Sequence, residues 1–480
     1  MGAIKRETMS EKLKKLFEDH FKEAVAELSP LPAHGSNREY FRLSNDKRSV
    51  IGAKNLDRLE NDAFVTFSRH FHSKDLTVPE IYAEDLENDI YLQQDLGDVT
   101  LFDYLLDVRK EHKDFPDRLL KTYERVVELL PQFQIKGGQG LDYSKSYPHH
   151  SFDRQSMMWD LNYFKYYFLK LAHIRFNEQQ LEQDFRTFTD FLLQADGNNF
   201  LYRDFQSRNI MLKDGKPWFI DYQGGRKGAL QYDIASLLFD AKADLPFEVR
   251  EHLLDHYLNA VAELIPIDRE AFTKHYYAFV FIRIMQAMGA YGYRGFYERK
   301  THFLQSIPYA IRNLEYLVRK VDLPIDIPVM MDVFQQLIQS SALREFGKAN
   351  LRLKVRISSF SYKHGVPVDD RGHGGGFVFD CRFLPNPGRE IAYKKLSAND
   401  QEVIAWFADK PDMDRWLKRM FTMVDAAVTS YEEQNFTDLM ISFGCTGGKH
   451  RSVHSANRLA AHLKETHDID VLLSHRELGD

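Results

Sequence analysis

One polar stretch and a later hydrophobic–acid pair constrain this chain more than any other feature. The stretch is Tyr202-Arg203-Asp204-Phe205-Gln206-Ser207-Arg208-Asn209, and the pair follows it as Ile220-Asp221. Between them, residues 210–219 read as two short strands joined by a turn at Asp214-Gly215. A hairpin of this kind brings Asp204, Asn209 and Asp221 to one end.

This arrangement suits phosphoryl transfer. The chemistry needs one carboxylate that orients or deprotonates an attacking hydroxyl, and an amide oxygen and a second carboxylate that hold Mg²⁺ against phosphates. Asp204 fits the first role, and Asn209 and Asp221 fit the other two. The alternative interpretation is a hairpin whose acidic residues only face water.

The spacing Asp-x-x-x-x-Asn, followed by a hydrophobic–Asp pair, resembles the catalytic loop and metal-binding strand of the protein-kinase-like superfamily. Residues 203–209, 220–223 and 231–238 are similar to the aminoglycoside phosphotransferase/choline kinase branch, and most similar to its anomeric kinases of N-acetylmuramate and N-acetylglucosamine. The resemblance implies a bilobal kinase that uses ATP and Mg²⁺. One departure is Tyr202, where the family usually has His, and it leaves a pseudokinase scaffold open as an alternative.

Composition narrows the class of protein. With 480 residues the chain is too long for a single core. No apolar run approaches the roughly 20 residues that a membrane helix needs. Only Cys381 and Cys445 occur, so we expect no disulfide framework and a cytoplasmic location. The net charge of −6 argues against nucleic-acid binding through overall charge.

Candidate nucleotide contacts precede the polar stretch. The turn at Gly35, Ser36 and Asn37 resembles the nucleotide-covering loop of the amino-sugar kinases, because small residues let backbone N–H groups approach phosphates closely. Lys54 ends a predicted strand over 49–54 and is a candidate contact to the ATP phosphates; a solvated lysine is the alternative.

A second candidate is the strand over 90–94, which runs into a turn at Gly97. In the family this segment is the hinge between the lobes. The resemblance therefore implies that the backbone from Gln93 to Asp95 meets the adenine.

Prolines at 324 and 328 mark a domain boundary, because a proline pair cannot continue a helix. We expect a kinase-like domain over 1–328 with lobes 1–97 and 98–328, a helix and linker over 329–349, and a second domain over 350–480. The predicted fold is an α+β bilobal protein-kinase-like domain followed by a smaller α/β domain.

The second domain opens with a basic strand. Residues 351–357 alternate strictly, so one face is apolar and the other basic. Such a patch could meet phosphates of RNA or of a small metabolite. A charged edge strand that prevents aggregation is the alternative.

A predicted strand over 439–443 then ends in a glycine loop before a helix. Strand, glycine loop and helix N-terminus with basic residues form a phosphate cradle. The spacing from Cys445 to Arg451-Ser452 also fits a tyrosine-phosphatase loop, in which a cysteine of low pKa attacks phosphate. We rank phosphate binding above phosphatase catalysis, because Gly444 replaces the usual His and no Trp-Pro-Asp acid loop is present.

Residues 359–365, 379–387, 444–452 and 475–476 resemble the C-terminal domain of the RNase adapter protein RapZ, which senses glucosamine-6-phosphate and binds small RNA. The resemblance implies phosphosugar contacts from Arg382, Cys445, Thr446, Gly447, Gly448, Lys449, His450, Arg451 and Ser452. The basic tail of that domain is not seen here, so sugar-phosphate sensing is the expected function and RNA binding stays an alternative.

Together the two resemblances predict an ATP-dependent kinase that phosphorylates an amino sugar of cell-wall metabolism at the anomeric hydroxyl. A C-terminal domain would sense a sugar phosphate. The alternative is a pseudokinase scaffold with an RNA-binding tail. The sequence leaves an oligomer open.

Overall fold

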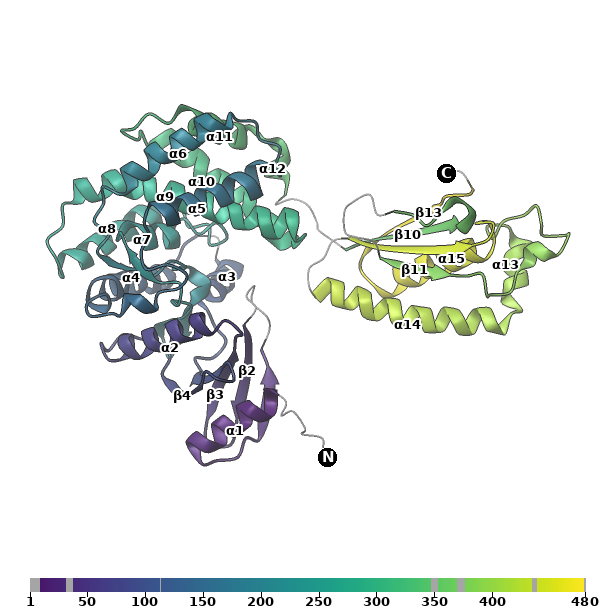
Figure 1. The fold of residues 1–480 in the computed structure, drawn as a ribbon, viewed down its shortest axis with the longest axis horizontal. Helices are drawn as coiled ribbons and strands as arrows, with labels where there is room; N and C mark the ends of the chain where they lie inside the picture. The colour runs from purple at the N-terminus through teal and green to yellow at the C-terminus, as the bar shows by residue number, and fades with distance from the viewer. Residues whose placement is uncertain are drawn as a thin grey trace. The chain divides into compact units, whose positions relative to one another are not determined.

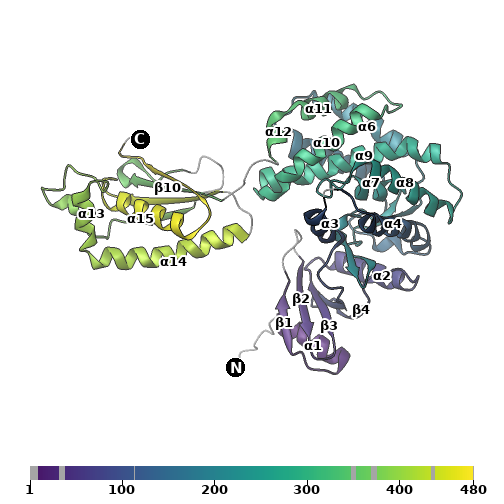
Figure 2. The same ribbon diagram turned by 180° about the vertical axis from the view of Figure 1, so that it is seen from behind.

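The computed structural model describes residues 9–31, 38–112, 114–346, 353–368, 376–433 and 438–478. The chain divides into two compact units, the first over residues 1–290 and 306–344 and the second over 291–305 and 345–480. Figures 1 and 2 show that each unit has its own sheet and its own helices.

The first unit begins with the N-lobe, a five-stranded antiparallel sheet with two helices (purple in Figure 1). The strand order is β1-β2-β3-β5-β4. The elements in chain order are α1 (Met9–Phe21), β1 (Glu27–Pro30), β2 (Glu39–Ser44), β3 (Ser49–Lys54), α2 (Arg58–His72), β4 (Ile81–Asp85) and β5 (Ile90–Gln94).

The two faces of this sheet have different partners, because side chains alternate along a strand. Leu43 and Val50 point to one face, where they share a buried cluster with Leu13 of α1. On the other face, the ring of Tyr91 lies 5.4 Å from that of Phe64 in α2. The sheet is therefore covered by α1 on one side and by α2 on the other.

The C-lobe is mainly helical (blue through teal to green in Figure 1). Its first helix begins at a capping box, in which the side chains of Thr100 and Asp103 each accept a backbone N–H of the other. The helices are α3 (Leu101–Glu111), α4 (Asp117–Pro131), α5 (Arg154–Phe164), α6 (Glu178–Leu192), α7 (Gln231–Leu238), α8 (Phe247–Ala262), α9 (Arg269–Tyr291), α10 (Ile307–Lys320), α11 (Pro328–Gln339) and α12 (Ser341–Glu345).

The helix expected in the linker lies with the first unit. Helix α11 packs against α6 and α10. It buries Met330, Val333, Phe334 and Leu337, and the backbone N–H of Met330 donates to the carboxylate of Asp184 at 2.8 Å. The first unit therefore continues beyond the proline pair.

Four short strands of the C-lobe position the predicted catalytic residues. They are β6 (Asn199–Leu201), β7 (Ile210–Lys213), β8 (Lys216–Phe219) and β9 (Arg226–Gly228). Strands β7 and β8 form an antiparallel hairpin, and β6 pairs antiparallel with β9. The hairpin turn at Asp214-Gly215 has positive φ at both residues, 52° and 72°. The predicted hairpin is therefore present with the predicted turn.

The second unit is a four-stranded parallel sheet with the order β11-β12-β10-β13. Strand β10 lies between β12 and β13, so the interpretation of this segment as an edge strand is wrong. Residues 351 and 352 lie outside the described residues. The elements are β10 (Lys354–Ser361), β11 (Phe377–Asp380), α13 (Gln401–Ala408), α14 (Pro411–Glu433), β12 (Asp438–Cys445), α15 (Arg451–Thr466) and β13 (Asp470–His475).

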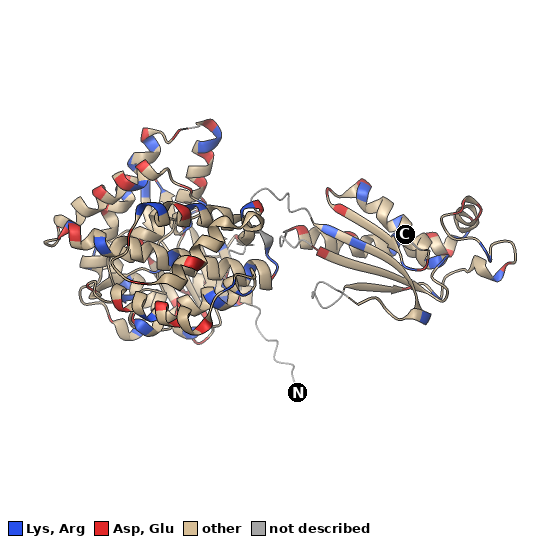
Figure 3. Ribbon diagram, turned by 90° about the horizontal axis from the view of Figure 1, so that it is seen from above, with Lys and Arg blue, Asp and Glu red and all other residues tan. Residues whose placement is uncertain are grey.

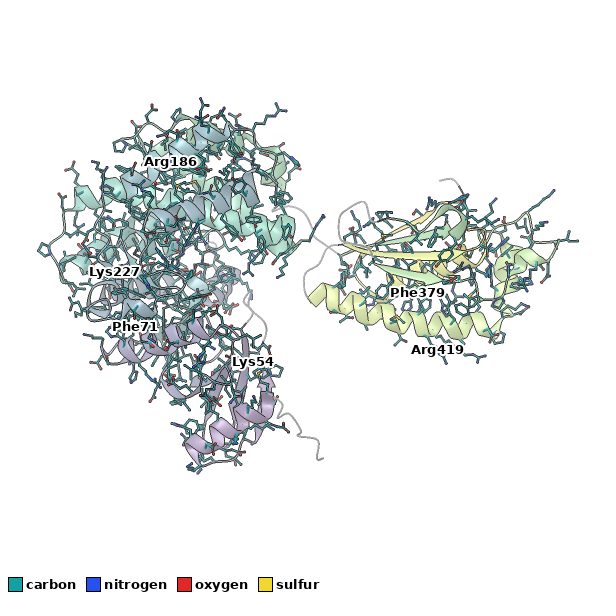
Figure 4. The ribbon with its side chains drawn as sticks, viewed as in Figure 1. Lys54, Phe71, Arg186, Lys227, Phe379 and Arg419 are labelled. Carbon is teal, nitrogen blue, oxygen red and sulfur yellow. The ribbon has the colours of Figure 1, made fainter. Side chains whose placement is uncertain are left out.

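Alternation along these strands separates the core from a polar face. Val355, Ile357 and Ile441 join the helices in one buried cluster. The intervening position of β10 carries Arg356, which makes a two-pronged contact to Asp438 at 2.7 and 2.9 Å. The ring of Phe379, labelled in Figure 4, lies 6.2 Å from that of Trp416 in α14. One basic residue of the predicted patch is thus neutralised within the sheet.

Charges of both signs are interspersed over the helices of the first unit (Figure 3). Among the described helices, none combines the length and the apolar character needed to cross a bilayer.

Candidate functional site

The structure brings Asp204, Asn209 and Asp221 together at the base of the hairpin. The side-chain amide nitrogen of Asn209 donates to the backbone carbonyl of Asp204 at 2.8 Å and to Oδ2 of Asp221 at 3.0 Å. The backbone N–H of Ile220 donates to the Asn209 carbonyl at 3.1 Å. The nitrogen of the Asn209 amide is therefore committed to the protein, and its oxygen is the atom that can coordinate a cation.

The electrostatics of this group favour a cation. Burial and the nearby negative charge of Asp204 raise the pKa of Asp221, while Gln223 and Arg38 oppose the shift. Two acids held close together repel unless a positive charge joins them. Asn209 and Asp221 offer an amide oxygen and a carboxylate, the kind of hard oxygen ligands that Mg²⁺ prefers, so these two residues fit that ion.

Two residues of the site hold unusual backbone conformations. Arg203 has φ of 83° and Asp221 has φ of 69°, the left-handed region that residues with a Cβ seldom adopt. Such strain persists only where surrounding contacts impose it. At both positions the left-handed conformation turns the chain sharply, directly before Asp204 in one case and at Asp221 itself in the other.

Side-chain anchors impose the strained conformation at Arg203. Its guanidinium binds both carboxylate oxygens of Asp160 in α5, at 2.8 and 2.6 Å, and donates to the Tyr232 hydroxyl at 2.9 Å. A paired, planar contact of this kind fixes orientation as well as position. The residue before Asp204 is therefore clamped to the helical core of the C-lobe.

Asp233 supports the same loop from beneath. Its fully buried carboxylate accepts the backbone N–H groups of Tyr202 at 2.8 Å and Arg203 at 3.0 Å, and the side-chain amide of Gln134 at 3.0 Å. Burial raises the pKa of Asp233 to about 7, although these three donors oppose the shift. These contacts make Asp233 a structural support for the loop.

Tyr202 supports the loop at the position where the family usually has His. The side chain is fully buried, and its hydroxyl donates to the backbone carbonyl of Ile220, just before Asp221. Burial raises the pKa of Tyr202 well above its usual value, so the hydroxyl stays a proton donor. Tyr202 therefore links the loop that carries Asp204 to the segment that carries Asp221.

A chain of polar contacts connects the N-lobe to Asp221. Nη2 of Arg38, just before β2, lies 3.2 Å from Oε1 of Glu60 in α2. The amide of Gln223 donates to that same oxygen at 3.1 Å and to Oδ1 of Asp221 at 2.8 Å. The ring of Tyr222 stacks on Phe64 of α2 at 5.1 Å. The position of α2 is thus coupled to that of Asp221.

Lys54 does not join this group. It shares a sheet face with Val50 and Gly52, and a Cβ built on Gly52 would lie 2.9 Å from Leu13 of α1. The ammonium lies 3.7 Å from the carboxylate of Glu39 on the neighbouring strand. Figure 4 labels Lys54 in the N-lobe sheet. The strand lysine predicted to contact phosphates therefore lies on the face opposite α2, because strand alternation directs it there.

The predicted hinge residues differ in how far they are already engaged. Asp95 accepts a two-pronged contact from Arg42 at 2.8 and 3.1 Å, and its backbone carbonyl accepts Lys213 at 2.7 Å. Gln93 is buried, and its side-chain oxygen has no hydrogen-bond partner among the described residues. An unpaired buried acceptor at this place fits a ligand with a hydrogen-bond donor. Gly35, Ser36 and Asn37 lie outside the described residues.

The glycine loop of the second unit closes around a thiol. The Cys445 sulfur accepts the backbone N–H of Gly448 at 3.2 Å and lies 3.1 Å from the Ser452 hydroxyl. Burial alone would raise the pKa of this thiol, but hydrogen bonds from Ser452, Gly448 and Gly447 outweigh it and lower the pKa below the usual value. The loop therefore stabilises negative charge at its centre.

The remaining residues of the predicted phosphosugar site surround this loop. Arg451 donates to the carbonyl oxygens of Arg382 and Leu384 and to the Thr446 hydroxyl. Thr446, Gly447 and Lys449 are exposed. The Arg382 guanidinium pairs with Asp380 and lies 4.0 Å from the centre of the Tyr362 ring. The ring of His450 faces inward, with Nε2 3.1 Å from the Tyr393 carbonyl.

Three residues around the site were not predicted from the sequence: Arg38, Gln223 and Asp160. Arg38 directly follows the turn at Gly35, Ser36 and Asn37, and Gln223 lies within the motif over 220–223, so proximity to the predicted site residues was an available signal. Asp160 sits in a helix remote in sequence, and nothing local marks it as the partner of Arg203.

Comparison with known proteins agrees with both resemblances. A sequence model of the Phosphotransferase enzyme family matches residues 27–271, about half of the chain, and one of the RapZ C-terminal domain matches residues 353–479. A nucleotide-binding protein of Hahella chejuensis is 35% identical over 144 residues, which cover 30% of this chain and 48% of that protein. The chain therefore spans about half the length of this curated relative.

Solved structures that resemble part of this chain include an ethanolamine kinase and a choline kinase. Ethanolamine kinase of Plasmodium vivax has a TM-score of 0.43 at 13% identity, covering 66% of this chain and 96% of that chain. Choline kinase of Cryptosporidium parvum has a TM-score of 0.42 at 12% identity, covering 61% and 90%. By the extent of the first family match, this protein belongs to the Phosphotransferase enzyme family, and it carries a RapZ C-terminal domain.

Proposed function

We propose that the first unit is an ATP-dependent kinase that phosphorylates an amino sugar, N-acetylmuramate or N-acetylglucosamine, at the anomeric hydroxyl. The convergence of Asp204, Asn209 and Asp221 carries the proposal. The family match supports phosphoryl transfer. The amino sugar and the anomeric position follow from the sequence resemblance alone.

In the proposed mechanism, the sugar hydroxyl attacks the γ-phosphorus of ATP, its proton passes toward the Asp204 carboxylate, and ADP leaves. Asn209 and Asp221 would hold Mg²⁺, which neutralises charge on the phosphates when bound. Arg203 holds the loop so that Asp204 faces the hydroxyl, because Asp160 clamps its guanidinium. Arg38 supplies positive charge on the α2 side of the sheet, where Glu60 orients it.

The test is ATP consumption by the full chain with N-acetylmuramate, N-acetylglucosamine, glucosamine and choline, with the product read by phosphorus NMR. We expect Asp204→Asn to lower kcat by at least a hundredfold, since general-base catalysis contributes about 10²–10⁴-fold. The variant should keep its circular dichroism spectrum and its Mg²⁺-dependent ATP binding. Full turnover by that variant would remove the assignment, and absence of ATP binding by the native chain would favour a scaffold.

We propose that the second unit binds a sugar phosphate at the loop of residues 445–452. Backbone N–H groups at the start of α15, exposed Lys449 and the nearby Arg382 together suit a phosphate dianion. Glucosamine-6-phosphate is the ligand that the RapZ resemblance implies. A bound phosphosugar would tune the kinase. RNA binding is a second proposal, and a single basic residue such as Arg382 is not enough to support it.

Cysteine alkylation tests this second site. Burial raises the pKa of Cys381 to about 12, whereas the loop lowers the pKa of Cys445. We expect iodoacetamide at neutral pH to modify Cys445 and spare Cys381, which serves as the internal control. The rate should fall as pH drops through the lowered pKa, because only the thiolate reacts. Mass spectrometry of tryptic peptides gives both rates.

Glucosamine-6-phosphate should slow the alkylation of Cys445 in a saturable way. Equal rates at the two cysteines, or no protection at any concentration, would contradict the site.

The lowered pKa of Cys445 and the adjacent Arg451 also favour a phosphatase as a second candidate. That candidate requires hydrolysis of an aryl phosphate that is lost in Cys445→Ser.

A further inference from the structure

A cluster of two histidines and a carboxylate lies on the C-lobe, apart from the residues of the phosphoryl-transfer site. His252 and His256 are one turn apart on α8, and Glu124 lies on α4, which packs against α8. Nε2 of His252 is 2.6 Å from Oε1 of Glu124, and Nε2 of His256 is 3.5 Å from the same oxygen. We propose that these three side chains bind a divalent transition-metal ion, with Zn²⁺ the best match.

The chemistry of the donors supports this choice. Two imidazoles and one carboxylate suit Zn²⁺ and its neighbours in the transition series, whereas Mg²⁺ and Ca²⁺ prefer oxygen alone. Histidines four residues apart on a helix present their rings on one face, as in zinc-binding helices. Ligands about 2 Å from a tetrahedral ion lie roughly 3.3 Å from one another. One ligand atom from each of Glu124, His252 and His256 lies within 4.8 Å of the others, so small rotamer changes close the site.

A further carboxylate, that of Glu128, lies near the other ring nitrogen of His256. Oε1 of Glu128, one turn after Glu124 on α4, lies 3.7 Å from Nδ1 of His256. Metal-binding histidines usually place a carboxylate or carbonyl at the ring nitrogen that does not face the ion. Arg125 holds the other oxygen of Glu128 at 3.2 Å. This arrangement orients His256 for coordination through Nε2.

The exposure of the cluster allows ion entry. The side chains of His252, His256 and Glu124 are 46%, 34% and 20% exposed. A fourth ligand position can therefore be filled by water, as in zinc sites with three protein ligands. An ordinary surface ion pair is the competing explanation, but such a pair contributes little and needs only one of the two rings.

The ion would join two helices that both reach the catalytic loop. Gln134 lies in the π-helical turn that continues α4, and its amide donates to Asp233 at 3.0 Å. The hydroxyl of Tyr257, the residue after His256, donates to the Gln134 side-chain oxygen at 2.6 Å. Asp233 in turn holds the N–H groups of Tyr202 and Arg203. A metal that ties α4 to α8 therefore stiffens the support beneath Asp204.

The test uses the full chain, free of any affinity tag and stripped with a chelator. Zn²⁺ is titrated calorimetrically, and Co²⁺ is added in parallel, because its visible spectrum reports coordination number and thiolate ligands. We expect one equivalent to bind with a tetrahedral spectrum that lacks thiolate bands. His256→Gln and the isosteric Glu124→Gln should each weaken binding at least tenfold while leaving the circular dichroism spectrum unchanged.

A second histidine–carboxylate cluster supplies a matched control. In the second unit, Nε2 of His467 lies 3.2 Å from Oδ1 of Asp425, and His462 contacts the same carboxylate. His467→Gln should leave the Zn²⁺ affinity within twofold of the native value. Loss of the ion in this variant, its retention in His256→Gln, or no saturable binding by the native chain would overturn the proposal.

Hydrogen exchange provides a readout independent of catalysis. Zn²⁺ should slow amide exchange in peptides covering 117–137 and 247–262, and this protection should vanish in Glu124→Gln. Unchanged exchange in these peptides at saturating Zn²⁺ would contradict the proposed link between α4 and α8. Because neither readout involves ATP or a sugar, the result does not depend on the proposed kinase function.

Discussion

At the scale of single residues, the positive charge beside α2 lies just before β2, and not at the end of β3 where the sequence motif suggests it. Lys54 ends β3 on the α1 face, and Ala53 takes the neighbouring position on the α2 face. Arg38 reaches Glu60 from the start of β2, and its positive charge opposes the raised pKa of Asp221. A positive charge thus lies on the α2 side at the residue just before β2, whereas Lys54 lies on the other face.

Because of this difference, we expect two charge-removing substitutions to change nucleotide affinity to different extents. Arg38→Met should weaken Mg²⁺-dependent binding of a non-hydrolysable ATP analogue at least tenfold, because charge-assisted hydrogen bonds are worth about 1.5–3 kcal/mol. Lys54→Met, the matched control, should change the affinity less than twofold. Equilibrium binding by calorimetry measures both. A loss in Lys54→Met with native affinity in Arg38→Met would restore the lysine to the phosphate site.

The site residues that could be predicted from the sequence are those whose contacts are local in the chain. Asp204, Asn209 and Asp221 meet because one hairpin joins them, and a turn signal and two short strands suffice to predict that. Arg38, Glu60 and Gln223 meet only after the N-lobe sheet, α2 and the C-lobe have packed together. Asp160 likewise reaches Arg203 from a helix 43 residues earlier in the chain. The spacing of residues within a short motif does not predict which face of a sheet a strand side chain points to, or how the two lobes pack together.

At the scale of secondary-structure elements, the hairpin β7–β8 keeps Asn209 and Asp221 in register. Asp214 and Gly215 both have positive φ, as a two-residue turn of the I′ type requires. This turn matches the twist of the flanking strands. A Cβ added at Gly215 would meet no atom within 4 Å, so any cost of adding one there comes from backbone conformation alone.

Gly215→Ala should therefore destabilise the first unit by about 1 kcal/mol, because a residue with a Cβ is disfavoured at positive φ. Gly197→Ala is the control, since Gly197 is also exposed, has no atom within 4 Å of an added Cβ and lies outside the left-handed range. That change should be neutral or slightly stabilising. Urea denaturation followed by fluorescence gives both values, and equal effects would show that the turn conformation does not matter.

Element order in the second unit was harder to foresee than element type. The alternating segment that forms β10 was predicted as a strand, and the glycine loop after β12 lies between a strand and a helix, as predicted. The position of β10 inside the sheet was not predicted, because parallel strands pair through crossovers whose order no local pattern specifies. The basic face of β10 consequently meets Asp438 of β12 rather than solvent alone.

At the scale of the whole molecule, the predicted fold class is confirmed: a bilobal α+β domain and a smaller α/β domain occupy one chain. Each unit encloses its own buried cluster. Leu13 and Leu43 belong to the N-lobe cluster, whereas Val355, Ile441 and Leu459 belong to that of the second unit. Units with separate cores unfold separately unless their interface is extensive.

Two ligands should therefore stabilise two different transitions in scanning calorimetry of the full chain. A non-hydrolysable ATP analogue with Mg²⁺ should raise the transition of the first unit, and glucosamine-6-phosphate that of the second. Each shift should correspond to about 2.7 kcal/mol when the ligand is at 100 times its Kd. Asp221→Asn should remove only the nucleotide shift, and Lys449→Met only the sugar-phosphate shift. A ligand that moves both transitions equally would instead mean that the units unfold as one, because stabilisation of one core then reaches the other.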